Sequence, residues 1–409
     1  MAREDGLLRG LYDRLRLNLY LNPGVLRFAH GPMLAPYYDA RRRHRSIWRL
    51  TGDALAFVVF TRIVIPLRAR KVARRWNWGS ARRRQAVAIG RRAFADPLDI
   101  ALYDIADAAE MKAYVRRFEH IGISRMIANP ATDHDPAIID KARFAETCRH
   151  HGLPHPATLA FRPGAGSWQV HALPKDDRLI VKPVTGSGGS GIVALEAPAG
   201  AMRDPNSLTA WLDDTVGEGP QALLLQPRLQ PHADLRLLAM DALPTLRIVT
   251  MLDEQGRPEA VATVTRFAAR AGVVTDNLHT GGLTAGIDHA TGRLGVARYG
   301  NAPGVLHRHP HTGAPITGAA VPFWKEALDL AVAAHAAAFP RHVQLGWDIA
   351  IGADGPILIE ANARPNPRTV QRGMGQGIGD TRYGVLIQHH LRRRIGDGPP
   401  PRLAVLRSG

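Results

Sequence analysis

The sequence predicts an α+β fold preceded by a basic, mainly helical N-terminal region. A chain of 409 residues is long enough for two or three domains. Short apolar runs, joined by glycine-rich or Asp-Gly turns, predict antiparallel hairpins, and longer segments with helical spacing stand between them. The charge is uneven, because residues 1–95 hold 21 Lys and Arg against 5 Asp and Glu, whereas the rest of the chain is nearly neutral.

The composition is typical of a soluble globular protein, with 45% apolar and 22% charged residues. Cys148 is the single cysteine, which excludes an internal disulfide and a cysteine-based zinc site. The first ten residues carry acids and lack an apolar core of signal-peptide length, which argues against secretion. We therefore expect a cytoplasmic protein, with a peripheral place on the inner face of the membrane if its basic region binds lipid.

The basic region, residues 1–95, contains an apolar stretch between clusters of arginine. The stretch covers residues 50–67 but includes Asp53 and Arg62, each of which would cost roughly 2.5–3.5 kcal/mol near a bilayer centre. Our first interpretation is a buried helix with solvated ends, and the second is a helix lying on an anionic membrane surface. Binding to nucleic acid is the least favoured, because aromatic residues are sparse.

A glycine-rich loop, residues 186–191, lies between apolar runs at 178–184 and 192–195. A dinucleotide-binding turn needs a helix after the loop, a Walker loop needs a terminal Gly-Lys-Ser/Thr, and a kinase needs later H-R-D and D-F-G sequences. The sequence meets none of these conditions. What remains is a hairpin loop whose backbone N–H groups cover phosphates, with Lys182 within reach. The alternative is a flexible hairpin that holds no ligand.

The segment 345–366 predicts a second hairpin, and this one carries acids. If it pivots about residue 354, within an Asp-Gly turn signal, Asp348 lies opposite Glu360 and Asn362 shares their face. Two carboxylates at that spacing repel each other unless a cation lies between them, and oxygen ligands favour Mg²⁺ or Mn²⁺. A register shift of one residue would separate the pair, and a solvent-facing hairpin with scattered acids is the alternative.

These two hairpins, in this order, resemble the ATP-grasp superfamily over roughly residues 120–390. The blocks TLRIVT, DNLHTGG and GWDIAI are similar to the sugar-transfer-associated ATP-grasp group and to α-L-glutamate ligase-like enzymes. The resemblance implies two α+β subdomains that clasp ATP. It divides the chain into a basic helical arm (1–95), a connecting segment (96–140), a small subdomain with glycine loop and hinge (141–230), a large subdomain with the metal hairpin (231–395) and a flexible tail (396–409).

The resemblance also implies which residues bind ATP. Lys141 matches the first phosphate lysine of the fold and Lys182 the second. Gln226 and Leu229 fall in the hinge strand that meets adenine through its backbone, although Pro227 stands where relatives usually carry Glu. Asp234 is a candidate for the ribose hydroxyls. The implied ATP-binding residues are Lys141, Lys182, Gly186, Ser187, Gly188, Gly189, Ser190, Gly191, Gln226, Leu229 and Asp234.

The same resemblance implies the metal ligands and the catalytic residues. Arg247 and Arg266 would stabilise the transferring phosphoryl group and the tetrahedral intermediate. Asn277 would belong to a loop that closes on the γ-phosphate. The implied ligands for Mg²⁺ or Mn²⁺ are Asp348, Glu360 and Asn362.

The implied activity is that of an ATP-dependent carboxylate–amine ligase that works through an acyl phosphate, in cell-surface sugar or peptide modification. Its partners would be ATP, a carboxylate and an amine, with an anionic membrane surface as a further partner of residues 1–95. Two alternatives remain open: an ATP-grasp phosphotransferase acting on a hydroxyl, and a non-catalytic ATP-binding scaffold docked through the basic arm.

Overall fold

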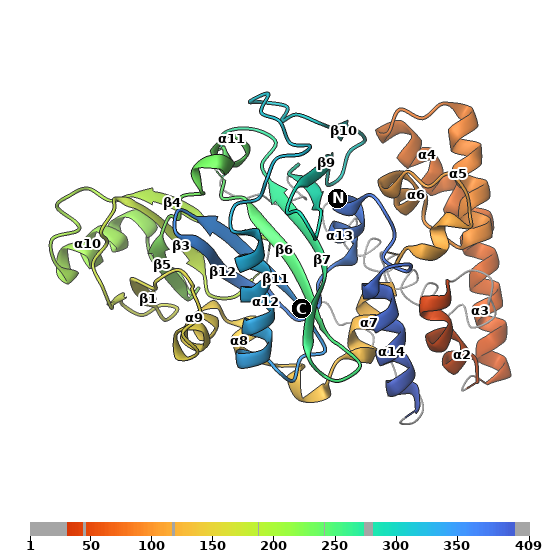
Figure 1. The fold of residues 1–409 in the computed structure, drawn as a ribbon, viewed down its shortest axis with the longest axis horizontal. Helices are drawn as coiled ribbons and strands as arrows, with labels where there is room; N and C mark the ends of the chain where they lie inside the picture. Colours follow the sequence, from red (N-terminus) through yellow and green to blue (C-terminus); the bar gives the residue numbers. More distant parts are fainter. Residues whose placement is uncertain are drawn as a thin grey trace.

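The computed structural model describes residues 31–43, 46–116, 119–186, 188–240, 242–273 and 281–396. These residues form a small sheet and a large sheet (Figure 1). A layer made of the N-terminal helices α2 to α6 lies beyond the large sheet, at the end away from the small sheet (Figure 1). The α+β prediction, with a helical N-terminal region, is confirmed over this part of the chain.

The N-terminal helices pack against one another and against the end of the chain. Val72 of α4 joins Ile89 of α5 and Ile100 of α6 in one buried cluster, and Tyr38 of α2 packs with α14. Arg116 forms a buried 2.6 Å ion pair with Glu119. The elements are η2 (Pro32–Leu34), α2 (Ala35–Arg43), α3 (Ile47–Val59), the π turn η3 (Phe60–Val64), α4 (Ile65–Arg75), α5 (Ser80–Ala93) and α6 (Pro97–Tyr103).

A series of short helices leads from this layer to the sheets. The last of them, α9, begins at Lys141 because the Asp140 carboxylate caps it by accepting the N–H groups of Ala142 and Arg143. The N–H of Lys141 donates to the carbonyl of Val184 at 2.9 Å, which fixes α9 against the small sheet. The helices are η4 (Glu110–Ala113), α7 (Glu119–Ile127), η5 (Pro130–Thr132), α8 (Pro136–Ile139) and α9 (Lys141–His150).

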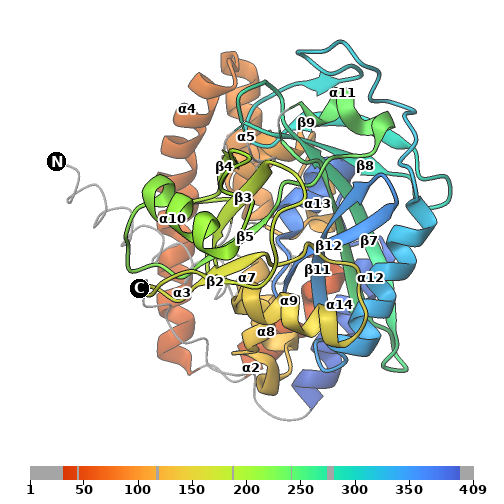
Figure 2. The same cartoon turned by 90° about the vertical axis from the view of Figure 1, so that its left-hand side faces the viewer.

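The small sheet has the strand order β2-β1-β5-β3-β4, and all its pairings are antiparallel. Leu208 and Leu212 of helix α10 are buried against its apolar side chains, and Figure 2 shows α10 beside the sheet. The runs at 178–184 and 192–195 form the predicted hairpin. The elements are β1 (Ala160–Arg162), β2 (Gln169–Val170), β3 (Arg178–Pro183), β4 (Val193–Glu196), α10 (Pro205–Val216) and β5 (Leu223–Pro227).

The large sheet has the strand order β10-β9-β8-β7-β6-β11-β12 and is also antiparallel. Before it come η6 (Ala233–Leu235) and α11 (Arg236–Ala239). The strands are β6 (Thr245–Leu252), β7 (Pro258–Phe267), β8 (Leu283–Ile287), β9 (Leu294–Tyr299), β10 (Val305–Leu306), β11 (Gln344–Gly352) and β12 (Gly355–Asn362).

Helices cover both faces of the large sheet. On one face α12 (Trp324–Ala338) buries Ala327, Ala331 and Ala334 against the strands. On the other face lie α13 (Pro367–Met374) and α14 (Arg382–Gly396), together with α7. The sheet is therefore a rigid central layer between two apolar cores.

A buried hydrogen-bonded chain joins α12 to the sheet. The Trp347 indole N–H donates to the Thr250 hydroxyl at 2.8 Å, and that hydroxyl lies 2.7 Å from Nδ1 of His335. Nε2 of His335 lies 2.8 Å from the carbonyl of His342. If the ring is neutral, Nε2–H donates to the carbonyl and Nδ1 accepts the Thr250 hydroxyl. Burial lowers the pKa of His335 to about 4.

In the acid-bearing hairpin, Asp348 pairs with Glu360 as predicted, but the strands near the turn pair in a different register. Gly352 pairs with Gly355 and Ile349 with Leu358, so the turn pivots half a residue earlier than residue 354. A bulge beyond Ile349 takes up one extra residue of β12 and brings Asp348 opposite Glu360. The predicted pairing of Asp348 with Glu360 is confirmed, and the bulge that produces it was not predicted.

Candidate active site

A row of charged side chains crosses three neighbouring strands of the large sheet. Asp348 on β11 lies between Glu360 on β12 and Arg247 on β6, each directly opposite it in the ladder. The carboxylate of Asp348 accepts Nε and Nη2 of Arg247 at 2.5 and 3.0 Å. It also accepts Nη2 of Arg266, on β7, at 2.9 Å. Sequence reasoning named these residues but did not predict that both arginines clamp this acid.

The two acids of the row have opposite electrostatic environments. Burial disfavours the charge on Asp348, but Arg247 and Arg266 outweigh that effect and lower its pKa to about 2. Burial raises the pKa of Glu360, and the negative charge of Asp348 raises it further. The row therefore holds one fixed carboxylate and one acid that would ionise more readily beside a cation.

The carboxylate oxygens of Asp348 and Glu360 are suitable ligands for a hard divalent cation that also binds phosphate oxygens. Among the residues that the structure describes, no group of three or more His, Cys, Asp or Glu side chains is arranged to hold a metal. The set here is two acids and Asn362, whose amide nitrogen lies 3.3 Å from Oε1 of Glu360. A half-turn of that amide would present its oxygen instead, giving three oxygen donors on one hairpin.

Two lysines face this hairpin from the small subdomain. Lys182, on β3, is only 7% exposed. Burial and, to a lesser degree, the charge of Lys141 lower its pKa to about 8, against the opposing charge of Glu360. The ammonium of Lys141 donates to the carbonyl of Gly186 at 2.8 Å. The charge of Lys141 also lowers the pKa of Glu360, so these three residues, which lie far apart in the sequence, are close together in the fold.

The loop between β3 and β4 has a backbone that only glycine adopts readily. Gly186, Gly188, Gly189 and Gly191 all have positive φ, between 71° and 108°. A Cβ on Gly191 would lie 2.8 Å from the Pro183 side chain. Ser190 belongs to the same turn, whereas Ser187 lies outside the described residues.

The predicted hinge connects the two sheets. Gln226 on β5 is buried, and its side-chain nitrogen donates to the Pro156 carbonyl at 3.3 Å. Leu229 is half-buried just after the strand. The His232 N–H then donates to the Ile351 carbonyl on β11 at 2.8 Å. Asp234 is exposed, lies 3.6 Å from the His232 ring, and is not brought to the lysines by any described contact.

The predicted closing loop falls largely outside the described residues. Asn277 lies outside the described residues. Gly281 is described, and its φ of 99° is one that favours glycine.

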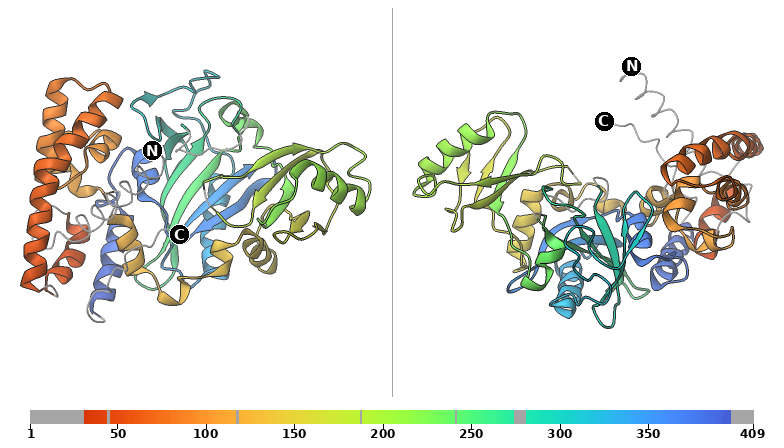
Figure 3. Two further views of the ribbon diagram at one scale, coloured as in Figure 1. Left: turned by 180° about the vertical axis from the view of Figure 1, so that it is seen from behind. Right: turned by 90° about the horizontal axis from the view of Figure 1, so that it is seen from above.

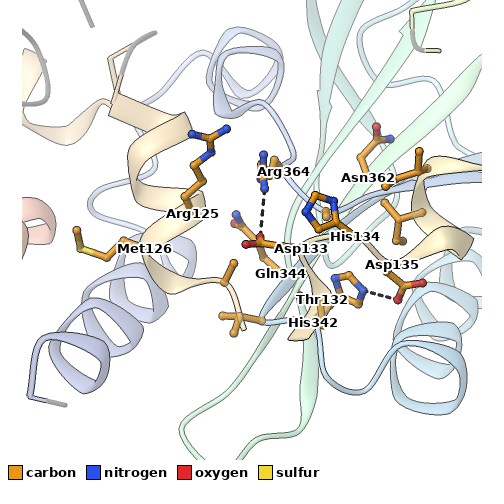
Figure 4. A pocket seen from close by; sticks show the side chains of 15 residues that line it. Arg125, Met126, Thr132, Asp133, His134, Asp135, His342, Gln344, Asn362 and Arg364 are labelled. Carbon is orange, nitrogen blue, oxygen red and sulfur yellow. Dashed lines mark hydrogen bonds and ion pairs between the residues drawn. The ribbon is translucent and has the colours of Figure 1, made fainter. Parts of the chain in front are cut away.

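A cavity of about 710 Å³ adjoins the acid row and was not predicted from the sequence (Figure 4). Asn362 lies on its wall, and Arg125 of α7 and Arg364, just after β12, approach it from different elements (Figure 4). Arg364 lies 3.3 Å from Asp133. Burial lowers the pKa of Arg125, and the charge of Arg364 lowers it further. Arg364 stands two residues after Asn362, a predicted metal ligand, whereas Arg125 lies in no sequence motif that would identify it.

A glycine loop and two lysines face an acid hairpin, which is the arrangement that the resemblance to the ATP-grasp superfamily implied. The family model described as sugar-transfer associated ATP-grasp matches residues 128–382. The chain belongs to that family, as its motifs predicted.

Comparison with solved structures gives distant matches. A D-cycloserine synthetase, DcsG, is 16% identical, with 74% of this chain and 82% of that one covered and a TM-score of 0.38. An L-amino acid ligase from Bacillus licheniformis is 14% identical, with 62% and 48% covered and a TM-score of 0.35. A D-alanine–D-alanine ligase from Bacillus anthracis, complexed with ATP, is 13% identical, with 63% and 68% covered and a TM-score of 0.33. No curated protein matches the chain.

Proposed function

We propose that this enzyme joins a carboxylate to an amine at the expense of ATP, through an acyl phosphate, and that it acts on a sugar- or peptide-containing acceptor of the cell surface. The family description supplies the link to sugar transfer. The observation that carries the proposal is the cavity beside Asn362, where Arg125 and Arg364 converge. Guanidinium groups bind carboxylates through paired hydrogen bonds, so this cavity suits a carboxylate donor.

The two guanidiniums of the cavity, rather than its net charge, support an anionic occupant, because Asp133 and Asp135 also line it. Arg125 and Arg364 are near enough for one positive charge to disfavour the other. A substrate carboxylate would relieve that repulsion and could replace Asp133 as the partner of Arg364, since that ion pair is partly exposed. The donor would then lie next to the acid row, where the γ-phosphate is expected.

The reaction assigns each part of the site a role. Lys141, Lys182 and the glycine loop would hold the phosphates of ATP, and Asp348, Glu360 and Asn362 would hold Mg²⁺ or Mn²⁺. The metal ion would neutralise charge that develops on the phosphate oxygens. A carboxylate oxygen attacks the γ-phosphorus and ADP leaves. The amine then attacks the acyl carbon, loses a proton to solvent, and phosphate departs with that carboxylate oxygen.

Arg247 and Arg266 act through Asp348 as well as directly. Their ion pairs keep Asp348 ionised, so the acid is ready to bind a cation without first losing a proton. Arg247 contacts Asp348 through Nε and Nη2, so its Nη1 can donate to a phosphoryl oxygen. Lys182, buried and with a lowered pKa, is positioned to bind phosphate as a desolvated point charge.

Hydroxylamine trapping tests the proposal. The protein is incubated with ATP, Mg²⁺, hydroxylamine and a pool of carboxylates, and hydroxamates are identified by mass spectrometry. We expect one hydroxamate, whose yield falls by about 100-fold or more in Glu360→Gln and is unchanged in Arg257→Gln. Arg257 is a suitable control because its side chain is exposed on the β6–β7 turn, away from the site.

The competing functions give different products. A phosphorylated hydroxyl compound without any hydroxamate would replace the ligase by a phosphotransferase. Tight binding of ATP without turnover, over a pool that includes amino acids, sugar acids and peptides, would favour a scaffold. Arg125→Gln should raise the KM for the trapped carboxylate, and an unchanged KM would remove the donor from this cavity.

A further inference from the structure

The helices α3, η3 and α4 form one continuous helical stretch, Ile47–Arg75, of which only the second half is packed into the protein. Ile65 and Ala69 of α4 are buried, whereas α3 has no buried residue. The first interpretation from the sequence, a buried helix, therefore does not describe α3. By length and composition alone the stretch could cross a membrane, but its second half is occupied by contacts with α5 and α6.

An exposed apolar row runs along this stretch. Leu55, Val59, Ile63 and Leu67 follow one another every four residues, and all four are exposed. Steps of four drift around an α-helix, which has 3.6 residues per turn. The wider π turn at Phe60–Val64 counters that drift and keeps the four side chains in line.

The row is large enough to need a partner. Leu55 is 67% exposed and Leu67 57% exposed, and the start of the helix adds Trp48 at 82%. Large apolar side chains exposed along one helical stretch in this way are typical of an interaction site. The helices α3 and α4, on which these residues stand, lie at the opposite end of the molecule from the small sheet (Figures 1 and 3).

A groove lined by arginines lies beside the row. It has a volume of about 340 Å³, and Pro66, the neighbour of Leu67, forms part of its wall. Arg70 enters from α4 and three more arginines enter from α5, and no acid is among the described residues of the lining. The cationic residues of the groove are Arg70, Arg83, Arg84 and Arg91.

The charge of the segment from α3 to α5 points to an anionic partner. Residues 46–95 carry twelve Lys and Arg and a single acid, Asp53. The four arginines are exposed, and Arg91 also donates through Nε to the Thr61 carbonyl at 3.1 Å. Guanidinium groups gathered around one groove favour an anion, and phosphate matches their hydrogen-bonding geometry. Nucleic acid would satisfy the arginines but would leave the apolar row in water. A bilayer with anionic headgroups satisfies both features at once.

We propose that the stretch Ile47–Arg75 lies on an anionic phospholipid bilayer, with the apolar row in the interface and a lipid phosphate in the four-arginine groove. The helix lies along the surface, because α4 is packed on α5 and α6. The small sheet, at the far end, stays clear of the bilayer and free to bind nucleotide. The proposal is independent of the reaction that the enzyme catalyses.

Vesicle flotation with the full-length protein tests this surface. Phosphatidylcholine vesicles with phosphatidylglycerol should carry the protein, and pure phosphatidylcholine vesicles should not. Arg83→Gln combined with Arg84→Gln should weaken binding by about 30-fold, because each of the two positive charges lost contributes binding free energy at an anionic surface. Leu55→Ser combined with Ile63→Ser removes two side chains of the apolar row and should abolish flotation. Val305→Ser, an exposed apolar residue on β10, is the matched control and should float normally.

Tryptophan fluorescence gives a second, positional measurement. The emission should shift to the blue when anionic vesicles are added, and brominated lipid should quench it. Trp48→Phe should remove most of that shift while the protein still floats. Circular dichroism and thermal unfolding of each variant show that the fold is retained.

Three results would overturn the proposal. One is equal flotation with neutral and anionic vesicles, or no effect of either double variant. Another is tight, salt-sensitive binding to duplex DNA without binding to vesicles. The third is a dimer, detected by sedimentation and broken by Leu55→Ser with Ile63→Ser, that does not bind vesicles.

Discussion

Replacing Asp348 by Asn should destabilise the large sheet, although the change is isosteric. Asp348 is buried and accepts three hydrogen bonds from Arg247 and Arg266. Lowering its pKa from 3.8 to about 2 corresponds to about 2 kcal/mol of favourable interaction after burial is counted. The variant also leaves two poorly exposed guanidiniums facing each other. Loss of one partner of a buried ion pair costs about 3–5 kcal/mol, which is the expected loss of unfolding free energy at neutral pH.

Urea unfolding followed by tryptophan fluorescence measures this loss, because Trp347 lies next to Asp348 on β11. Glu360→Gln is the matched control. The raised pKa of Glu360 means that its charge is disfavoured in the folded state, so its removal should leave stability equal or higher. Stability of Asp348→Asn within about 1 kcal/mol of the natural sequence would refute the ion-pair argument.

Three further predictions concern separate parts of the molecule. Lys182→Met should weaken ATP binding by about 10–100-fold in calorimetry, whereas Lys71→Met, on the exposed side of α4, should not; equal effects would exclude a phosphate role for Lys182. Because burial lowers the pKa of His335 from 6.5 to about 4, the unfolded state takes up a proton first as the pH falls, and stability should drop by about 2 kcal/mol between about pH 7.5 and pH 5. His335→Gln should flatten that slope, and an unchanged slope would contradict the assignment. Chelation of divalent metal should abolish hydroxamate formation, and full activity in chelator would exclude the acid row as a metal site.

The local residue pattern is sufficient to predict those strands and helices that can be identified without knowing their neighbours in the fold. The apolar and β-branched residues of TLRIVTML, residues 245–252, are typical of a strand, and the whole run is β6. The helix-forming residues of 323–338 are typical of a helix, and α12 begins one residue into that segment and ends with it. The strands β8 to β10 were not predicted, since they are short and their pairing is set by the neighbouring strands. The acid pair was predicted by counting from the wrong pivot, and the bulge in β12 compensated for that error.

Two features of the site could not be read from the sequence, because each joins distant segments. The clamp on Asp348 brings together β6, β7 and β11, and among 47 arginines no spacing rule selects Arg247 and Arg266 as its partners. The cavity joins α7 to the chain after β12, and Arg125 has no local signal at all. Sequence pattern identified the chemistry of the hairpins, but the packing of the sheets decides which charges meet.

Isotope transfer tests the central claim most directly. The carboxylate found by hydroxylamine trapping is labelled with ¹⁸O in both oxygens and incubated with ATP, Mg²⁺ and the amine acceptor, and the released phosphate is analysed by mass spectrometry. The acyl-phosphate account predicts one ¹⁸O atom in each phosphate released with the amide product, and no transfer in Glu360→Gln. Amide product accompanied by phosphate without ¹⁸O would contradict the account.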